Sequence, residues 1–397
     1  MSKFTTISPK DWKLSEVSET QKLKVQKYTG FSFDDIIDRA KNATYGFLSN
    51  HFNKDAKAVE GHYDPTIKKS QPSNLTNLIA PLQFLAMYDM FGDTDMLEKA
   101  KGCADFIYNN VTIWWPMHMW QGGVRDTGEM DGQVWVKYTA EALLMNVAVY
   151  TRSKDKEYLR RAKQNATFLK QAQRHGFKFV FDEKNQKWFD NGWKSFGRVV
   201  EGFLALYDVT ENEKYLERAQ AWGDYGLTLQ SENGCFYLID DYFYNTDIAP
   251  NEIRGMVYLY KATDKRKYLD SAIKYADWHV EHQREDGGWL LAIDRDDEVV
   301  CDVVGPGDPA NIGISMLALY DETKEKKYLN SAVKALKYSV KMQAVPGCLY
   351  NKYLDDPKVL WGFWSWEPTL DWTLCGDQSV HHVRAMFFIP YYIALKL

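Results

Sequence analysis

The sequence predicts an all-α fold, a closed (α/α)6 toroid built from six helical hairpins in one ring. Five segments share one pattern: an apolar helix, a short polar turn and an amphipathic helix. A repeated tyrosine, 53 to 62 residues from the next, marks each segment. Lone helices are expected at 33–52 and 379–396, and pairing the first helix with the last completes the sixth hairpin. An open helical stack is the structural alternative. The tyrosines are Tyr88, Tyr150, Tyr207, Tyr260 and Tyr320.

The two helices of each hairpin differ in character, which predicts an inner and an outer ring. The first helix is apolar on most sides, as in 199–207 and 314–320, and is expected to be packed all round. The second carries Lys and Glu on one face, as in 214–229 and 327–342, and is expected to face water. We predict an N-terminal extension at 1–32 and a single catalytic domain at 33–397.

Composition excludes several classes of protein. Of 397 residues, 26% are charged and 45% hydrophobic, with a net charge of −5, which excludes a disordered chain. No basic run is present, so nucleic acid is not an expected partner. Five cysteines without CxxC or Cys/His spacing predict neither a metal site nor a disulfide framework, and no cofactor is expected. The longest apolar run, 385–395, is too short for a bilayer, and the N-terminus lacks a signal-peptide pattern. We therefore expect a cytoplasmic protein, with its oligomeric state left open.

Tryptophan gathers in the long loops that must line the rim opposite the short turns. Flat aromatic side chains at the mouth of a cleft suit sugar rings, so an oligosaccharide substrate is expected there. Packing of the loops is the alternative for some of them. Trp364 and Trp366 are among the expected sugar contacts. The loop tryptophans are 114, 115, 120, 188, 193, 289, 361, 364, 366 and 372.

Two loop carboxylates, Asp126 and Asp190, are candidates for chemistry. Each lies in a loop rich in Gly and Trp, several residues before the next helix. A carboxyl flanked by indoles and removed from water has a raised pKa, as a general acid requires. Asp308 also fits an N-cap, and we keep it as a possible substrate contact.

Arginines near the expected starts of inner helices suggest recognition of an anion. Arg198 and Arg254 could bind a carboxylate such as that of a uronic acid, because helix N-termini also favour anions. The alternative is that these arginines only neutralise acidic side chains. His382, at the front of the last inner helix, could be a base or a sugar hydrogen-bond partner.

From about residue 76 onward the chain resembles the six-hairpin sugar-active enzymes, and most closely the unsaturated glucuronyl hydrolases of glycoside hydrolase families 88 and 105. Asp126-Thr-Gly128 is similar to the family's Asp-x-Gly turn, Asp190 to its second aspartate, and Arg254-Gly255 to its Arg-Gly pair. Two departures are present. Arg125 stands where the family has His, and Arg254-Gly-Met-Val-Tyr258 replaces Arg-Gly-Gln-Ala-Trp.

The resemblance implies a glycoside hydrolase that releases a terminal 4,5-unsaturated uronic acid from an oligosaccharide. An aspartate would protonate and hydrate the vinyl ether instead of attacking the anomeric carbon. Asp190 would be the proton donor and water activator, with Asp126 as its partner. The uronate would be held by Arg254 or Arg198, and the rings would stack on Trp193 and Trp120.

Three other functions fit the same predicted fold. A polysaccharide lyase would use Tyr242, Tyr244 or His118 as its base. An acylglucosamine-type sugar 2-epimerase would use paired histidines, and His382-Val-Arg384 is slightly similar to its motif. Asp308, however, stands where that enzyme needs a second His. A non-catalytic carbohydrate-binding toroid would have the aromatics but no use for isolated loop carboxylates.

Overall fold

The structure is a computed structural model, and the chain divides into two compact units that are treated separately. It describes residues 17–71, 73–115, 120–126, 132–190, 194–236, 242–244, 249–367 and 372–397. Unit 1 contains residues 101–279 and 292–300, and unit 2 contains residues 17–100, 280–291 and 301–397. Among the described helices, none has the length and apolar character needed to cross a membrane.

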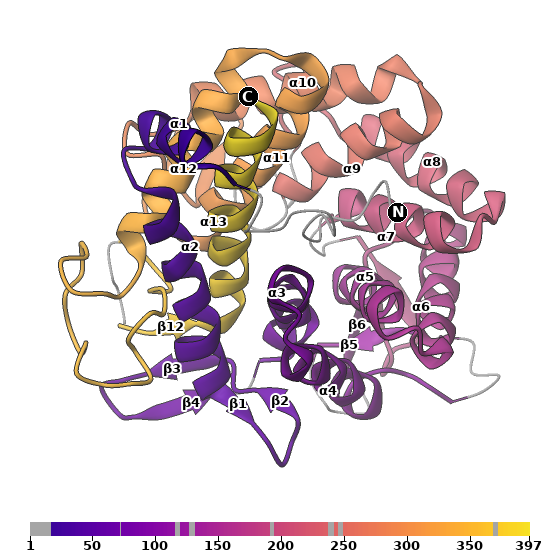
Figure 1. Cartoon of the computed structure of the whole chain (residues 1–397). Coiled ribbons are helices and arrows are strands. Elements are labelled where there is room, and N and C mark those ends of the chain that lie inside the picture. The colour runs from indigo at the N-terminus through magenta and orange to yellow at the C-terminus, as the bar shows by residue number, and fades with distance from the viewer. Residues whose placement is uncertain are drawn as a thin grey trace. The chain divides into compact units, whose positions relative to one another are not determined.

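All five predicted helix pairs are present, joined by two-residue turns (Figure 1). The first helix of each pair is the more buried one. In α7, for example, every residue from Phe196 to Leu206 is buried. The pairs are α3 (Asn74–Phe91) with α4 (Thr94–Asn110), α5 (Val136–Ser153) with α6 (Lys156–Arg174), α7 (Phe196–Thr210) with α8 (Glu213–Leu227), α9 (Ala249–Thr263) with α10 (Arg266–Glu281), and α11 (Gly307–Thr323) with α12 (Lys326–Met342).

The repeated tyrosine marks the last turn of each inner helix. Its backbone carbonyl accepts a hydrogen bond from the amide four residues later, as Tyr320 does from Lys324 at 2.8 Å. That later residue has a positive φ, which ends the helix and reverses the chain. The five such residues are Gly92, Lys154, Glu211, Asp264 and Lys324, with φ between 54° and 71°. The common sequence pattern thus encodes one common turn.

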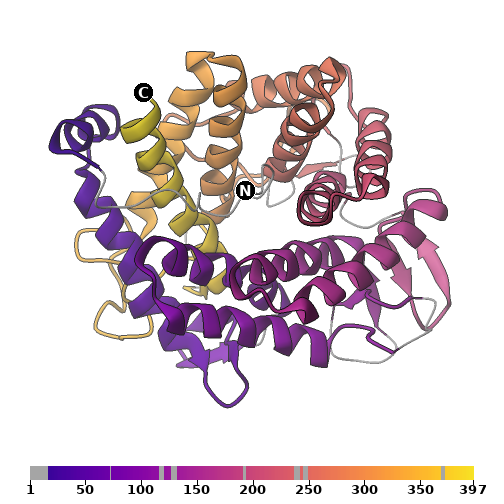
Figure 2. The same ribbon diagram turned by 45° about the vertical axis from the view of Figure 1, so that its right-hand side comes forward.

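The predicted pairing of the first and last helices is found within unit 2. Helix α13 (Gly376–Lys396) packs against α2 (Phe33–Asn42) and also against α3 and α11. Figures 1 and 2 both show the yellow α13 beside the indigo α2. The expected helix 33–52 continues past α2 as a π-helical turn (Ala43–Phe47) and a 3-10 turn (Leu48–His51). A further helix that was not predicted, α1 (Glu19–Thr29), packs against α12 and α13.

The predicted loops contain short β-strands that the sequence analysis did not anticipate. In unit 1, four strands form an antiparallel sheet in the order β5-β6-β7-β8. In unit 2, β12 (Leu374–Cys375) adds to the β3–β4 hairpin (His62–Asp64, Lys69–Gln71). The sheet strands of unit 1 are β5 (Val124–Arg125), β6 (Gln133–Trp135), β7 (Val180–Asp182) and β8 (Lys187–Phe189). The remaining strands are β1 (Phe52–Asn53), β2 (Ala58–Val59), β9 (Tyr242–Tyr244), β10 (Ala292–Asp294) and β11 (Val299–Cys301).

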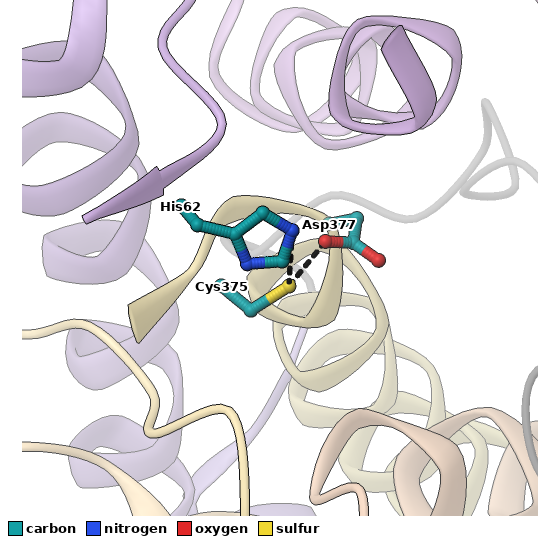
Figure 3. A group of neighbouring side chains, drawn as sticks. All are labelled: His62, Cys375 and Asp377. Carbon is teal, nitrogen blue, oxygen red and sulfur yellow. Dashed lines mark hydrogen bonds between the residues drawn. The ribbon is translucent and has the colours of Figure 1, made fainter. Parts of the chain in front are cut away.

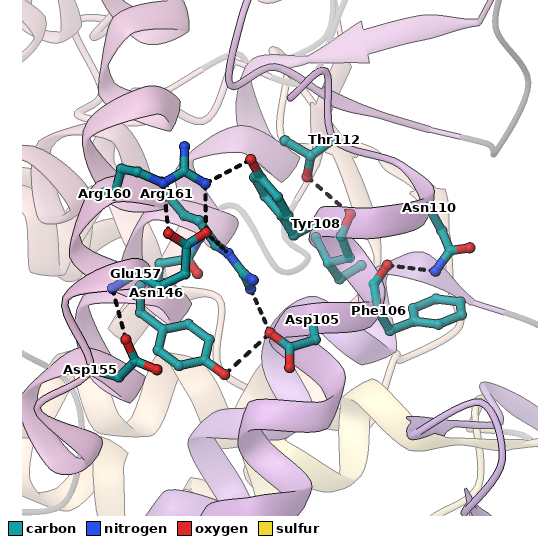
Figure 4. Close-up of polar contacts among 12 residues, drawn as sticks. Asp105, Phe106, Tyr108, Asn110, Thr112, Asn146, Asp155, Glu157, Arg160 and Arg161 are labelled. Carbon is teal, nitrogen blue, oxygen red and sulfur yellow. Dashed lines mark hydrogen bonds and ion pairs between the residues drawn. The ribbon is translucent and has the colours of Figure 1, made fainter. Parts of the chain in front are cut away.

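Polar contacts join the outer helices α4 and α6 of unit 1. Arg161 pairs with Asp105 at 2.6 Å and with Glu157 at 3.1 Å, and its guanidinium lies over the ring of Tyr108. Figure 4 shows Arg161 between these two carboxylates. Since Asp105 and Glu157 are partly exposed, the pairs orient the outer helices more than they stabilise the fold.

The inner helices α7 and α9 are in close backbone contact at Gly197, near the start of α7, and Gly255, in the middle of α9. A Cβ on Gly255 would lie 2.7 Å from the Cα and carbonyl oxygen of Gly197. Backbone atoms cannot move aside as side-chain ends can, so this contact excludes any side chain. The contact brings together the polar residues that flank both glycines.

We expect Gly255→Ala to lower the free energy of unfolding by about 1 to 3 kcal/mol, because the added methyl group overpacks the helix contact. Gly202→Ala is the matched control, since Gly202 lies within α7 and the nearest atom to its added Cβ would be a Leu143 side-chain atom at 3.3 Å, with the Ala140 carbonyl at 3.7 Å. There the helix preference for alanine offsets the tighter packing. Urea unfolding followed by circular dichroism measures both, and equal effects would contradict the role of the glycine contact.

Candidate active site

In unit 1, the inner helices α5, α7 and α9 enclose a network of charged side chains. Arg198 pairs with Glu141 at 2.6 Å and with Glu201 at 2.5 Å. Arg254 pairs with the other oxygen of Glu201 at 2.8 Å and donates to Asn251 at 2.7 Å. Each of the four charged side chains is at most 4% exposed, so the two guanidiniums and two carboxylates neutralise one another away from water.

A third carboxyl, that of Glu252, lies beside the same network, and the charges of Arg198, Arg254 and Glu201 act on it. Its Oε2 accepts from the backbone amide of Gly197, and its Oε1 accepts no hydrogen bond from the described residues. Complete burial raises the pKa of Glu252 well above its usual value, and the negative charge of Glu201 adds to this shift. Burial therefore favours the protonated, uncharged form of the Glu252 carboxyl.

Both arginines predicted to bind a uronate belong to this network. The guanidiniums of Arg198 and Arg254 already contact carboxylates and are buried, so their role toward a substrate stays a prediction. Their partners Glu141 and Glu201, and the neighbouring Glu252, were not singled out in the sequence. The three-residue spacing of Arg198 and Glu201 on an apolar helix was the signal that could have identified the network.

The two predicted catalytic aspartates lie beside the β5–β8 sheet of unit 1. Asp126 follows β5, and its backbone amide donates to Gln133 at 2.9 Å. Asp126 is exposed, and the partial burial of its carboxyl raises its pKa. Asp190 follows β8, and its side chain is 55% exposed and forms an ion pair with Lys178 at 2.5 Å.

Strand register separates these two aspartates. Asp126 extends the row of Gln133, Asp182 and Lys187, whereas Asp190 lies three residues further along β8. The two aspartates are separated by three strand spacings across the sheet and by three residues along the strands. Together these separations place their backbones about 17 Å apart. The sheet therefore does not bring Asp126 and Asp190 together as a pair acting on one bond.

The predicted tryptophan contacts of unit 1 divide between packing and surface. Trp120 is buried against Phe181, with ring centroids 4.1 Å apart, and against Trp188 at 5.5 Å. The buried indole of Trp120 therefore packs against the β7–β8 hairpin. Its role in stacking on a sugar ring stays a prediction. Trp193 lies outside the described residues. Trp114 and Trp115 are 44% and 42% exposed and offer the more accessible indole surfaces.

In unit 2, the remaining predicted residues lie near the starts of α11 and α13. Asp308 is half-buried in the first turn of α11, and its backbone amide donates to Gly305 at 2.9 Å. Trp364 is buried, with its indole N–H donating to the Tyr350 carbonyl at 3.2 Å. Trp366 is half-buried. Trp364 therefore packs the loop that precedes α13.

His382 lies inside unit 2, in the second turn of α13. Its ring stacks on Phe363 with centroids 4.0 Å apart, and neither ring nitrogen has a hydrogen-bond partner among the described residues. Burial lowers the pKa of His382 to about 3, so the imidazole is neutral at physiological pH. The structure thus places a neutral, buried imidazole at this position.

Unit 2 contains two further polar groups. The Glu367 carboxylate pairs with Arg284 at 3.0 Å and accepts from the hydroxyls of Tyr338 and Tyr350. Near the start of α13, three potential metal ligands of different chemical types lie within 4.8 Å of one another. They are His62, Cys375 and Asp377, and no other such group is found in the described part of the chain. Because His62 and Cys375 are 313 residues apart, no local spacing revealed them.

Comparison with known proteins gives matches in structure alone. No protein-family model matches the chain, and no curated protein matches it in sequence. Cellobiose 2-epimerase from Bacillus thermoamylovorans B4167 is similar with a TM-score of 0.72 and 13% identity, over 91% of this chain and 99% of that one. The fold is the (α/α)6 toroid. The fold implied by the sequence resemblance is therefore confirmed.

Two glycoside hydrolases have similar structures as well. A family 76 α-mannanase from Bacteroides thetaiotaomicron matches with a TM-score of 0.67 and 13% identity, over 93% of this chain and 98% of that one. An unsaturated glucuronyl hydrolase from Bacillus sp. GL1 matches with a TM-score of 0.66 and 12% identity, over 89% and 96%. Several sugar chemistries thus occur on the fold shared with this chain.

We expect Glu252→Gln to change how stability depends on pH. The unfolded chain loses the Glu252 proton near its ordinary pKa of 4.5, whereas burial makes the folded chain hold it to higher pH. Folding then takes up a proton above pH 4.5, so this group's contribution to stability falls as pH rises from that value toward the raised pKa of the folded chain. The variant lacks this proton, so its free energy of unfolding relative to wild type should rise with pH over that window, by at most about 1.4 kcal/mol per pH unit.

Urea unfolding at each pH measures this difference. Glu232→Gln changes an exposed glutamate of the same unit and should leave the pH profile of stability unaltered. A constant difference between Glu252→Gln and wild type over the range would show that Glu252 ionises normally in the folded chain.

Proposed function

We propose that the protein is a carbohydrate-active enzyme, a glycoside hydrolase that releases a terminal 4,5-unsaturated uronic acid from oligosaccharides. The observation that carries the proposal is the raised pKa of Asp126, at the position that resembles the Asp-x-Gly turn of the glucuronyl hydrolases. The shared fold supports it, since the three similar structures described above are sugar-processing enzymes. An oligosaccharide partner and a cytoplasmic location belong to the same proposal.

Asp126 can perform both proton transfers of the proposed reaction. Its protonated form donates a proton to a carbon of the vinyl ether, and the resulting carboxylate takes a proton from the water that adds to the ring. A raised pKa favours the protonated form needed for the first step. One carboxyl suffices for this sequence, so the separation from Asp190 is no obstacle. Asp190 remains a proposed catalytic partner and Trp193 a proposed sugar contact.

Uronate binding by Arg198 or Arg254 requires a rearrangement within the buried network. A substrate carboxylate would have to replace Glu141 or Glu201 as the partner of one guanidinium. Such an exchange keeps the charge balance if the displaced glutamate takes up a proton, the form that burial also favours for Glu252. Under this proposal Trp366 and Asp308 remain candidate substrate contacts in unit 2.

A sugar 2-epimerase is the second candidate, and His382 is the observation that favours it. A neutral imidazole can accept the proton next to a sugar carbonyl, and burial keeps His382 neutral. Cellobiose 2-epimerase is also among the similar structures. The candidate bases of a lyase offer no such support, because His118 and the side chains of Tyr242 and Tyr244 lie outside the described residues.

We expect Asp126→Asn to lower turnover of unsaturated uronic oligosaccharides by about 10² to 10⁴-fold, because the amide cannot donate and recover a proton. Loss of the ultraviolet absorbance of the conjugated double bond measures turnover. Asp182→Asn is the matched control on the same cross-strand row and should retain activity. Circular dichroism verifies that each variant is folded.

The same assay separates the alternatives. Wild-type turnover by Asp126→Asn together with loss in Asp190→Asn would assign the acid to Asp190. An increase in absorbance on saturated substrates would identify a lyase. Unchanged absorbance, with C2 inversion of a reducing sugar that His382→Gln abolishes, would replace the hydrolase by an epimerase.

A further inference from the structure

Strand pairing brings His62 and Cys375 onto one face of the small sheet in unit 2. The two residues are directly opposite each other in the antiparallel pair β3–β12. Side chains at opposed positions of such a pair project to the same side. The imidazole Nε2 and the thiol Sγ lie 3.9 Å apart. The backbone pairing of the two strands therefore holds the imidazole and the thiol next to each other.

Asp377 completes a group of three in the first turn of α13. Its Oδ1 accepts the hydrogen of the Cys375 thiol, and the potential ligand atoms of the three residues all lie within 4.8 Å of one another. Figure 3 shows the imidazole, the thiol and the carboxylate converging on one point. Each comes from a different local structure: the strand β3, the strand β12 and the helix α13.

The chemistry of the three ligands selects among metals. A nitrogen, a sulfur and an oxygen donor match Zn²⁺, whereas Mg²⁺ and Ca²⁺ prefer oxygen alone. Zinc bond lengths of 2.3 Å to sulfur and about 2.05 Å to nitrogen place those two atoms about 3.6 Å apart in a tetrahedron. The observed 3.9 Å is close to this distance. Asp377 needs only to rotate away from the thiol to make room for the ion.

The surroundings fix the backbone at this position and leave one side accessible. A Cβ on Gly376 would lie 2.9 Å from the Thr76 side chain and 3.0 Å from the Gly61 carbonyl, so the start of α13 is packed tightly. Cys375 is buried, while His62 and Asp377 are half-buried. An ion can therefore enter past the imidazole and the carboxylate, and water can reach a fourth position.

Charge balance favours a divalent cation. Binding releases the thiol proton to solvent, so the thiolate and the Asp377 carboxylate together neutralise Zn²⁺. The positive end of the α13 dipole opposes a cation, but this effect is weak beside three direct ligand bonds to zinc, so the ligand set outweighs the dipole.

We propose that His62, Cys375 and Asp377 bind one Zn²⁺ ion, with water in the fourth coordination position. Three protein ligands and one open position are typical of zinc sites that polarise a bound oxygen. The site lies at the start of an inner helix and is independent of the hydrolase proposal, since it requires no sugar substrate. It also joins strands from the two ends of the described chain through a metal.

Metal titration of the full-length protein tests the proposal. After removal of metal by a chelator, we expect one equivalent of Zn²⁺ to bind with a Kd below about 1 μM and to raise the thermal unfolding midpoint. Co²⁺ in place of zinc should give a thiolate-to-metal charge-transfer band. Cys375→Ser should abolish that band, and His62→Gln should weaken zinc binding at least about 100-fold.

Cys348→Ser is the matched control, because it removes a half-buried cysteine elsewhere in the same unit. It should bind both metals as wild type does. If Cys375→Ser fails to fold, His62→Gln and Asp377→Asn carry the test, with circular dichroism as the folding check. Wild-type protein that binds no zinc below 1 μM, or variants at all three positions that bind as wild type does, would overturn the proposal.

Discussion

The contact between Gly197 and Gly255 is the constraint on which the interior of unit 1 depends. With no side chain at either position, the backbones of α7 and α9 meet and bring Arg198 and Arg254 together. Two guanidiniums buried away from water need carboxylate partners to offset their lost hydration. Glu141 and Glu201 are these partners. The cost of removing these charges from water is offset only because the network is nearly complete. Packing of the backbone thus dictates the electrostatics of the site.

Most of the helical framework could be predicted because its signal is local. Apolar spacing and the tyrosine before each turn are properties of single segments. Helix α1 was missed because it is mostly polar, and only Val25 and Thr29 of its residues are buried. The short strands were missed because two or three residues carry no periodicity, and their pairing depends on distant segments. Glu141 and Glu201, the partners of the arginines, were missed for a similar reason. The sequence alone does not give the rotation of one inner helix against the next.

The tryptophans show why a composition argument reaches only part of a site. Long loops on a helical ring need an apolar centre of their own, and Trp120 and Trp364 provide it, each almost fully buried. An indole does this well because it fills a large volume and its N–H reaches a carbonyl, as Trp364 does to Tyr350. Trp114 and Trp115 remain at the surface, in contact with each other edge to face. Clustering in the sequence therefore located the loops correctly, but it did not distinguish an indole that packs from one that faces solvent.

The position of α13 has a consequence for the order of folding. This helix packs against α2 and α3, from which it is separated by roughly three hundred residues of chain. Contacts over such a separation close long loops and form late, since their entropy cost is met only when the intervening elements are in place. Until α13 is made, the faces of α2 and α3 that it covers are without this helix, although α1 already contacts α2 and β2 contacts α3. A chaperone that shields α2 and α3 would therefore be needed most while the last helix is still being made.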